Sequence, residues 1–123
     1  EAWEALAQAI KEASFYITNS FPIRSEGESA YHSSKNTIKW DAIIVLRKRG
    51  SIQYDSLSSK SLLELLVEWT NYINTEQLAL KKCDIRNFFR ALATQYYVAD
   101  PRKNCLKDLF STVEDYVEDY CDA

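Results

Sequence analysis

The sequence is poor in the residues that build cofactor loops and membrane spans. It has two glycines, two prolines, one histidine and no methionine among 123 residues. Gly27 and Gly50 stand far apart, so no glycine-rich loop that cradles phosphate groups is present. No segment approaches the ~18 to 20 apolar residues of a membrane helix, and no basic and apolar leader opens the chain. We therefore expect a cytoplasmic protein without membrane contact.

Metal and nucleophile sites are also poorly represented. Cys83, Cys105 and Cys121 are too widely spaced for paired zinc ligands, and their odd number argues against a disulfide framework. His32 is the only histidine, so a Cys/His catalytic pair would need a distant thiol to fold against it. We expect reduced thiols, no metal site and no catalytic residue in this chain.

The chain opens inside an apparent helix. Its first residues, Glu1-Ala2-Trp3, offer no capping side chain for the first backbone donors, and no initiator methionine precedes them. This pattern predicts a fragment or a processed piece of a longer protein.

The first fifty residues predict a helix followed by two strands. Apolar residues recur at helical spacing from Trp3 to Ala13. Residues 15–21 then alternate with a period of two and are stopped by Pro22. Residues 41–46 are apolar from Ala42 on, which is typical of a strand covered on both faces. We expect the two strands to pair antiparallel, with Ile44 and Leu46 buried.

The second part predicts three helices that pack as a bundle. Their apolar stripes run over residues 62–73, 85–96 and 106–120. The expected N-caps are Ser58 or Ser59, Asp84 and Asn104, and the second helix must end by Asp100-Pro101. The chain is thus predicted to be α+β, with one unit over residues 1–50 and a helical extension over residues 51–123.

Two short motifs resemble a known enzyme family. Trp3-Glu4-Ala5-Leu6 leads into a strand that ends in Pro22-Ile23-Arg24-Ser25-Glu26, and Asn36 precedes the apolar strand that ends at Arg47. This order resembles the C-terminal end of the catalytic domain in S-adenosylmethionine-dependent DNA amino-methyltransferases, most closely the large adenine-specific enzymes. The likeness covers residues 3–49.

The resemblance implies the end of a Rossmann-like methyltransferase fold. In that family a glycine-rich loop binds S-adenosylmethionine and an Asp/Asn-Pro-Pro-Tyr/Trp motif grips the flipped base. Neither motif exists in this sequence. The parent protein would therefore use S-adenosylmethionine and DNA, whereas this chain alone would bind no cofactor and be inactive.

The long polar connection between the strands is the first candidate site. If residues 15–21 form the last parallel strand of an open sheet, the loop leaves from the substrate side. The candidates for phosphate or base contacts there are Arg24, His32, Lys35 and Asn36, with Glu26 orienting Arg24. An exposed loop with an ordinary Arg/Glu pair is the alternative.

A basic stretch in the helical part is the second candidate site. Between Lys81 and Lys107 seven Lys or Arg stand against two Asp, and six acids without a base follow from Asp108 on. The candidates for DNA-phosphate contacts are Arg86, Arg90, Arg102 and Lys103. A solvated surface is the alternative.

A different class of function also fits the sequence. The chain would then be a non-catalytic helical module for protein–protein interaction or oligomerisation. An exposed sheet edge left by truncation favours pairing with a second copy, so a homodimer is one expected partner state.

Overall fold

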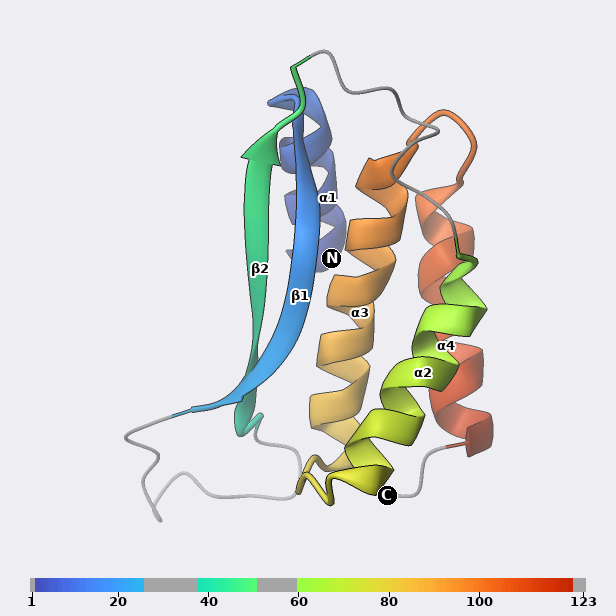
Figure 1. Ribbon diagram of the computed structural model, residues 1–123. Coiled ribbons are helices and arrows are strands. Elements are labelled where there is room, and N and C mark those ends of the chain that lie inside the picture. Colours follow the sequence, from blue (N-terminus) through green and yellow to red (C-terminus); the bar gives the residue numbers. More distant parts are fainter. Residues whose placement is uncertain (1, 26–37, 51–59, 121–123) are drawn as a thin grey trace.

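The computed structural model describes residues 2–25, 38–50 and 60–120 of the chain (Figure 1). The elements, in chain order, are α1 (Ala2–Glu12), β1 (Phe15–Arg24), β2 (Trp40–Lys48), α2 (Leu62–Thr75), α3 (Lys82–Ala99) and α4 (Leu106–Tyr120). The described part is therefore α+β, with four helices and one antiparallel strand pair, as the sequence predicts.

The elements form layers around α3. The β1–β2 pair covers one side of α3, α1 lies beside both, and α2 and α4 pack on the opposite side (Figure 1). α3 is in contact with every other helix and with both strands. One hydrophobic core therefore draws residues from both sides of position 50, and the predicted division into two units at that position stays a prediction.

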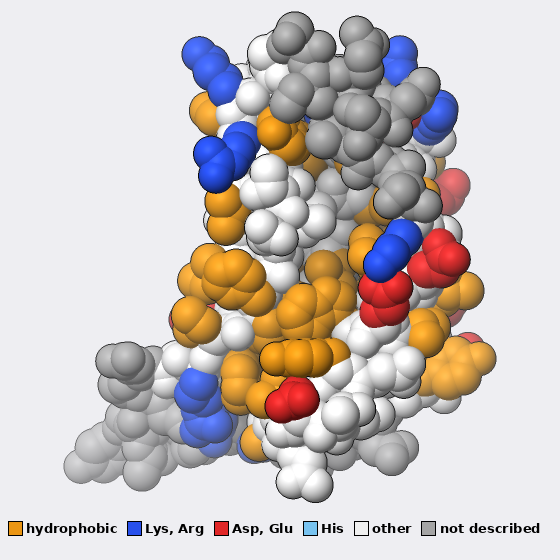
Figure 2. Space-filling model, in the orientation of Figure 1, with side chains coloured by type: hydrophobic (Ala, Val, Ile, Leu, Met, Phe, Trp, Pro, Cys, Tyr) orange, Lys and Arg blue, Asp and Glu red, His pale blue; other side chains and the backbone are white. Residues whose placement is uncertain are grey.

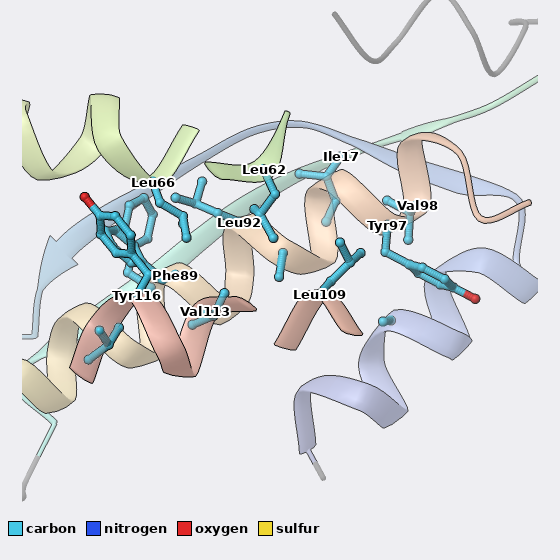
Figure 3. Close-up of a cluster of buried hydrophobic side chains, with 14 of the residues drawn as sticks. Ile17, Leu62, Leu66, Phe89, Leu92, Tyr97, Val98, Leu109, Val113 and Tyr116 are labelled. Atoms are coloured by element: carbon cyan, nitrogen blue, oxygen red, sulfur yellow. The ribbon is translucent and has the colours of Figure 1, made fainter. Parts of the chain in front are cut away.

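The core is a layer of aromatic and branched side chains centred on α3. Phe89 is fully buried, and its ring lies 6.0 Å from that of Tyr116 on α4. Leu92 of α3 and Val113 of α4 lie close by, and Leu66 reaches them from α2 (Figure 3). Burial of this apolar surface is the main source of stability for a domain of this size.

Strand β1 extends past the proline at which the sequence predicted a stop. Pro22 pairs in register with Ala42, and the strand continues to Arg24. A proline is tolerated there because β1 has a strand neighbour on one side only. The register shifts between Ile17 and Asn19, which leaves Thr18 as the extra residue of a β-bulge.

The helix caps differ from those predicted. Ser58 and Ser59 lie outside the described residues, and α2 is capped by Ser61. The Ser61 hydroxyl accepts from the Glu64 amide, and the Glu64 carboxylate accepts from the Ser61 amide. This reciprocal pair satisfies two backbone donors, which a serine farther upstream cannot do.

The next two caps were also assigned wrongly. The helix α3 begins at Lys82, so Asp84 is its third residue, and its carboxylate accepts from the Lys81 amide. The Asn104 side chain donates to the Asp100 carbonyl, at the end of α3, instead of capping α4. The predicted end of α3 before Pro101 is confirmed.

Burial of β2 is one-sided. Ile44 is half-buried and packs on the core, but Leu46 is 42% exposed and Ile43 is 36% exposed. The prediction that Leu46 is buried is therefore wrong: strand alternation places it on the same face as Ile44, but it lies nearer the end of β2, beyond the part of the strand that packs on the core.

Every helix in residues 2–25, 38–50 and 60–120 is too short or too polar to span a lipid bilayer.

We expect Phe89→Ala to lower the free energy of unfolding by about 3–5 kcal/mol, because it removes a fully buried ring from the centre of the core. Leu46→Ala is the matched control, since its side chain is already partly exposed, and it should cost far less. Urea denaturation followed by circular dichroism measures both. Equal midpoints for the two variants would contradict this description of the core.

Candidate functional site

The base of the connection between β1 and β2 is fixed by hydrogen bonds. The Ser25 amide donates to the Lys39 carbonyl at 2.9 Å, which closes the strand pair. One oxygen of Asp84 accepts from the Lys39 amide at 2.8 Å and from the Trp40 amide at 3.2 Å. Asp84 is 1% exposed, so this buried carboxylate joins the start of β2 to the first turn of α3.

Only one of the predicted loop residues lies in the described part of the chain. Arg24 is exposed at the last position of β1. Glu26, His32, Lys35 and Asn36 lie outside the described residues. The substrate-side role predicted for these five residues therefore stays a prediction.

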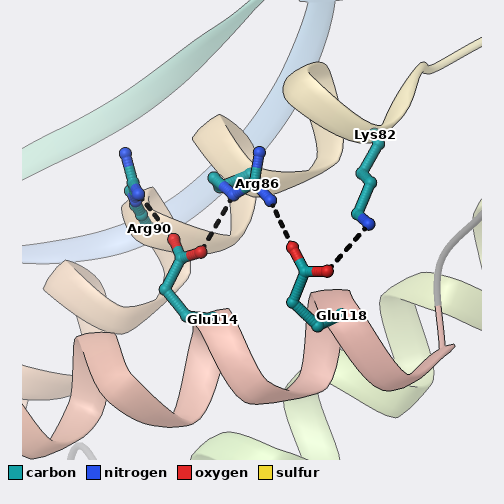
Figure 4. Close-up of polar contacts among 5 residues, drawn as sticks. All are labelled: Lys82, Arg86, Arg90, Glu114 and Glu118. Atoms are coloured by element: carbon teal, nitrogen blue, oxygen red, sulfur yellow. Dashed lines mark hydrogen bonds and ion pairs between the residues drawn. The ribbon is translucent and has the colours of Figure 1, made fainter. Parts of the chain in front are cut away.

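Two of the four predicted phosphate contacts are engaged in ion pairs between helices. Arg86 donates to Glu114 at 3.0 Å and to Glu118 at 2.8 Å, and Arg90 pairs with Glu114 at 2.5 Å. Lys82 also pairs with Glu118 (Figure 4). The three α3 cations and the two α4 carboxylates thus form one ladder, in which all but one of the positive charges are compensated.

This ladder responds to acid. The hydrogen bond from Lys82 and its positive charge hold the pKa of Glu118 below its ordinary value. Because the carboxyl pKa is lower in the folded state, the ion pair stabilises that state fully at pH values above the pKa that Glu118 has in the unfolded chain. That contribution is lost as the pH falls through the lower, folded-state pKa.

The other two predicted phosphate contacts share one carboxylate. Arg102 lies 3.2 Å and Lys103 3.7 Å from Asp100, whose side chain is only 3% exposed. Both cations remain largely exposed, at 62% and 67%. They lie at the turn after α3, whereas Arg86 and Arg90 lie along the helix, so the four residues do not form one cluster.

Sequence reasoning missed the role of Arg49. Its guanidinium is buried, donates to the Val98 carbonyl at the end of α3, and lies 5.7 Å from the centre of the Tyr16 ring. The Arg49 amide also donates to the Ser14 carbonyl. This arginine therefore joins the ends of β2, α1 and α3, and the run of three cations at 47–49 gave no sign of it.

Packing accounts for the tryptophans. Trp69 meets the Phe88 ring edge-on at 4.7 Å and the Tyr72 ring at 5.4 Å. Trp40 is half-buried at the start of β2. Trp69 therefore packs on the core rather than forming an open stacking platform.

The outward face of the strand pair carries four apolar side chains beside the polar Asn19 and Asp41. Phe21 is paired in register with Ile43, and Asn19 with Val45. Phe21 and Ile23 are 39% and 46% exposed. We call Phe21, Ile23, Ile43 and Val45 the outer sheet face; Figure 2 shows hydrophobic side chains along the side of the molecule where the strands lie. The sequence signal for this face was the continuous apolar run in β2.

The expectation of no metal site and of reduced thiols stays a prediction. Within the described ranges, no group of three or more His, Cys, Asp or Glu side chains is placed to hold a metal ion. Cys83 and Cys105 are not joined to each other in a disulfide, and Cys121 lies outside the described residues.

No family model, no curated protein and no solved structure matches the chain.

We expect Asp84→Ala to destabilise the fold by roughly 2–4 kcal/mol, because it leaves the amides of Lys39, Trp40 and Lys81 without their buried acceptor. Hydrogen exchange should accelerate at these three amides before it does in the core. Asp108→Ala, which removes an exposed acid from the first turn of α4, is the control. Unchanged exchange at Lys39 and Trp40 would rule out the proposed anchor.

Proposed function

We propose that this chain is the non-catalytic C-terminal part of an S-adenosylmethionine-dependent DNA adenine or cytosine amino-methyltransferase. In this proposal its strand pair docks, through the outer sheet face, on the remainder of the catalytic α/β domain. The parent protein supplies the cofactor site and the base-gripping motif, and this chain supplies a rigid end piece.

The exposed outer sheet face carries the proposal. Helices α1 and α3 cover only one face of the pair, while Phe21, Ile23 and Ile43 remain exposed on the other. A continuous apolar run such as 42–46 is typical of strands covered on both faces, as in α/β sheets. A second layer from the parent domain would supply the missing cover.

Further support comes from the order of motifs and elements. The motif Trp3-Glu4-Ala5-Leu6 lies in α1, and Pro22-Ile23-Arg24 ends β1, which pairs antiparallel with β2. A helix followed by such a pair is compatible with the end of a doubly wound sheet that carries one antiparallel strand. The sequence holds no glycine-rich loop, so in this proposal the cofactor site belongs to the parent protein.

DNA contact is the weaker part of the proposal. The cations that would contact phosphates already have acidic partners: Arg86 and Arg90 pair with α4, and Arg102 and Lys103 pair with Asp100. Binding DNA phosphates would require these ion pairs to break, and the free energy that this costs would offset part of the free energy gained from the phosphate contacts. We therefore propose that the parent domain provides most of the DNA affinity.

The decisive observation is the coding sequence upstream of Glu1. The proposal expects a glycine-rich cofactor loop and an Asp/Asn-Pro-Pro-Tyr/Trp motif there. The upstream segment and this chain, produced as two tagged polypeptides, should then copurify. Phe21→Lys with Ile23→Lys should abolish copurification, because two charges would be buried against an apolar surface.

The matched control changes an equally exposed apolar pair on another element. Leu63→Lys with Val67→Lys alters α2, where these side chains are 52% and 42% exposed, and should leave copurification intact. Equal loss in both double variants would contradict docking through the sheet. An upstream frame without either motif would overturn the methyltransferase assignment itself and favour a helical interaction module.

We expect the isolated chain to bind duplex DNA only weakly and in a salt-sensitive manner, near the weak end of the ~10⁻⁴ to 10⁻⁶ M range of non-specific binding. Fluorescence anisotropy at two salt concentrations measures this. Arg102→Ala with Lys103→Ala should weaken binding more than Arg86→Ala with Arg90→Ala, because the side chains of the first pair are more exposed. A larger loss of binding in the Arg86/Arg90 double variant would contradict the conclusion that the α3–α4 ion pairs keep these two arginines from contacting DNA.

A further inference from the structure

The far edge of β2 has the features of a self-pairing strand. The sheet has two strands, so β2 has β1 as its only described strand neighbour (Figure 1). The nine residues of β2 contain neither proline nor glycine, and an edge strand of this kind is open to further pairing. β1 is less suited to the same role, since Pro22 removes one backbone donor from it.

The charges of β2 are symmetric about its centre. Asp41 lies three residues before Ile44, and Arg47 lies three residues after it. Both side chains are exposed, and neither forms an ion pair within the described residues. In an antiparallel pairing of two β2 strands centred on Ile44, each Asp41 would lie directly opposite the partner's Arg47.

The apolar residues between these charges match in the same register. Ile43 would lie opposite the partner's Val45, and Ala42 opposite the partner's Leu46. This places a partner beside Leu46, which is 42% exposed in the single chain. A shift of one residue in one direction would place Asp41 opposite Leu46, and a shift in the other direction would pair Asp41 with Lys48 but leave Arg47 opposite Ala42. Only the register centred on Ile44 pairs Asp41 with Arg47 and leaves no charged side chain from 41 to 47 opposite an apolar one.

We propose that a second copy of this chain pairs with β2 along its far edge, in antiparallel register centred on Ile44, to form a two-fold symmetric dimer with a four-stranded sheet. Two-fold symmetry makes both Asp41–Arg47 contacts form at once. The pairing uses the edge of the sheet rather than its outer face, so it goes beyond the docking proposed above and does not depend on it.

The test is a charge exchange followed by sedimentation velocity over a wide range of protein concentration. Wild type should dimerise as concentration rises. Asp41→Arg alone and Arg47→Asp alone should each raise the dissociation constant about tenfold or more, because like charges then face each other at two positions. Circular dichroism checks that each variant is folded.

Mixing gives the sharper result. An equimolar mixture of the Asp41→Arg chain and the Arg47→Asp chain should form heterodimers, since each arginine then faces an aspartate. The double variant Asp41→Arg/Arg47→Asp should recover self-association. Asp119→Arg, which makes the same charge change at an exposed position on α4, should dimerise like wild type.

A monomeric wild type at all concentrations, a dimer unaffected by either single variant, or a mixture that stays monomeric would each overturn the proposal. Failure here is distinguishable from failure of the docking proposal, because docking is tested through Phe21 and Ile23 on β1. Loss of dimerisation with intact copurification, or the converse, identifies which surface was assigned wrongly.

Discussion

The burial of α3 is the constraint on which the rest of this structure depends. Ten of its eighteen residues are buried, and it contacts the strand pair on one side and the other helices on the rest of its surface. A two-stranded sheet is at best marginally stable in water without a surface to pack on. The strand pair and the helices therefore stabilise one another through α3, and the core that they share draws residues from both halves of the chain.

Two buried carboxylates mark the ends of this helix, and both serve the architecture. Asp84 accepts three backbone amides, from Lys39, Trp40 and Lys81, and so holds the start of β2 on the first turn of α3. Asp100, next to the last turn, neutralises part of the charge of Arg102 and Lys103. Buried acids often indicate catalytic sites, but here each has hydrogen-bonding or ionic partners that account for its burial.

The described surface has two kinds of region: helices whose charged side chains pair with one another, and a strand pair whose apolar side chains are exposed. Along α3 and α4 the cations and carboxylates pair with one another, which leaves little net charge to attract a polyanion. The outer sheet face and the far edge of β2 have no such compensation in the described part of the chain. Interactions of this protein are therefore expected to depend more on apolar contact and strand pairing than on long-range electrostatics.

The sequence by itself determined the element types, because hydrophobic spacing distinguishes the helices from the strands and Pro101 limits α3. It also predicted the antiparallel strand pair, which the structure confirms. Only the tertiary structure decided which residues cap the helices, where β1 has its bulge at Thr18, and which partner each charged side chain has. These features depend on which backbone amides and side chains meet across elements. Asp84 illustrates the difference: its spacing suggested a cap, whereas its contacts with Lys39 and Trp40 come from residues more than forty positions away.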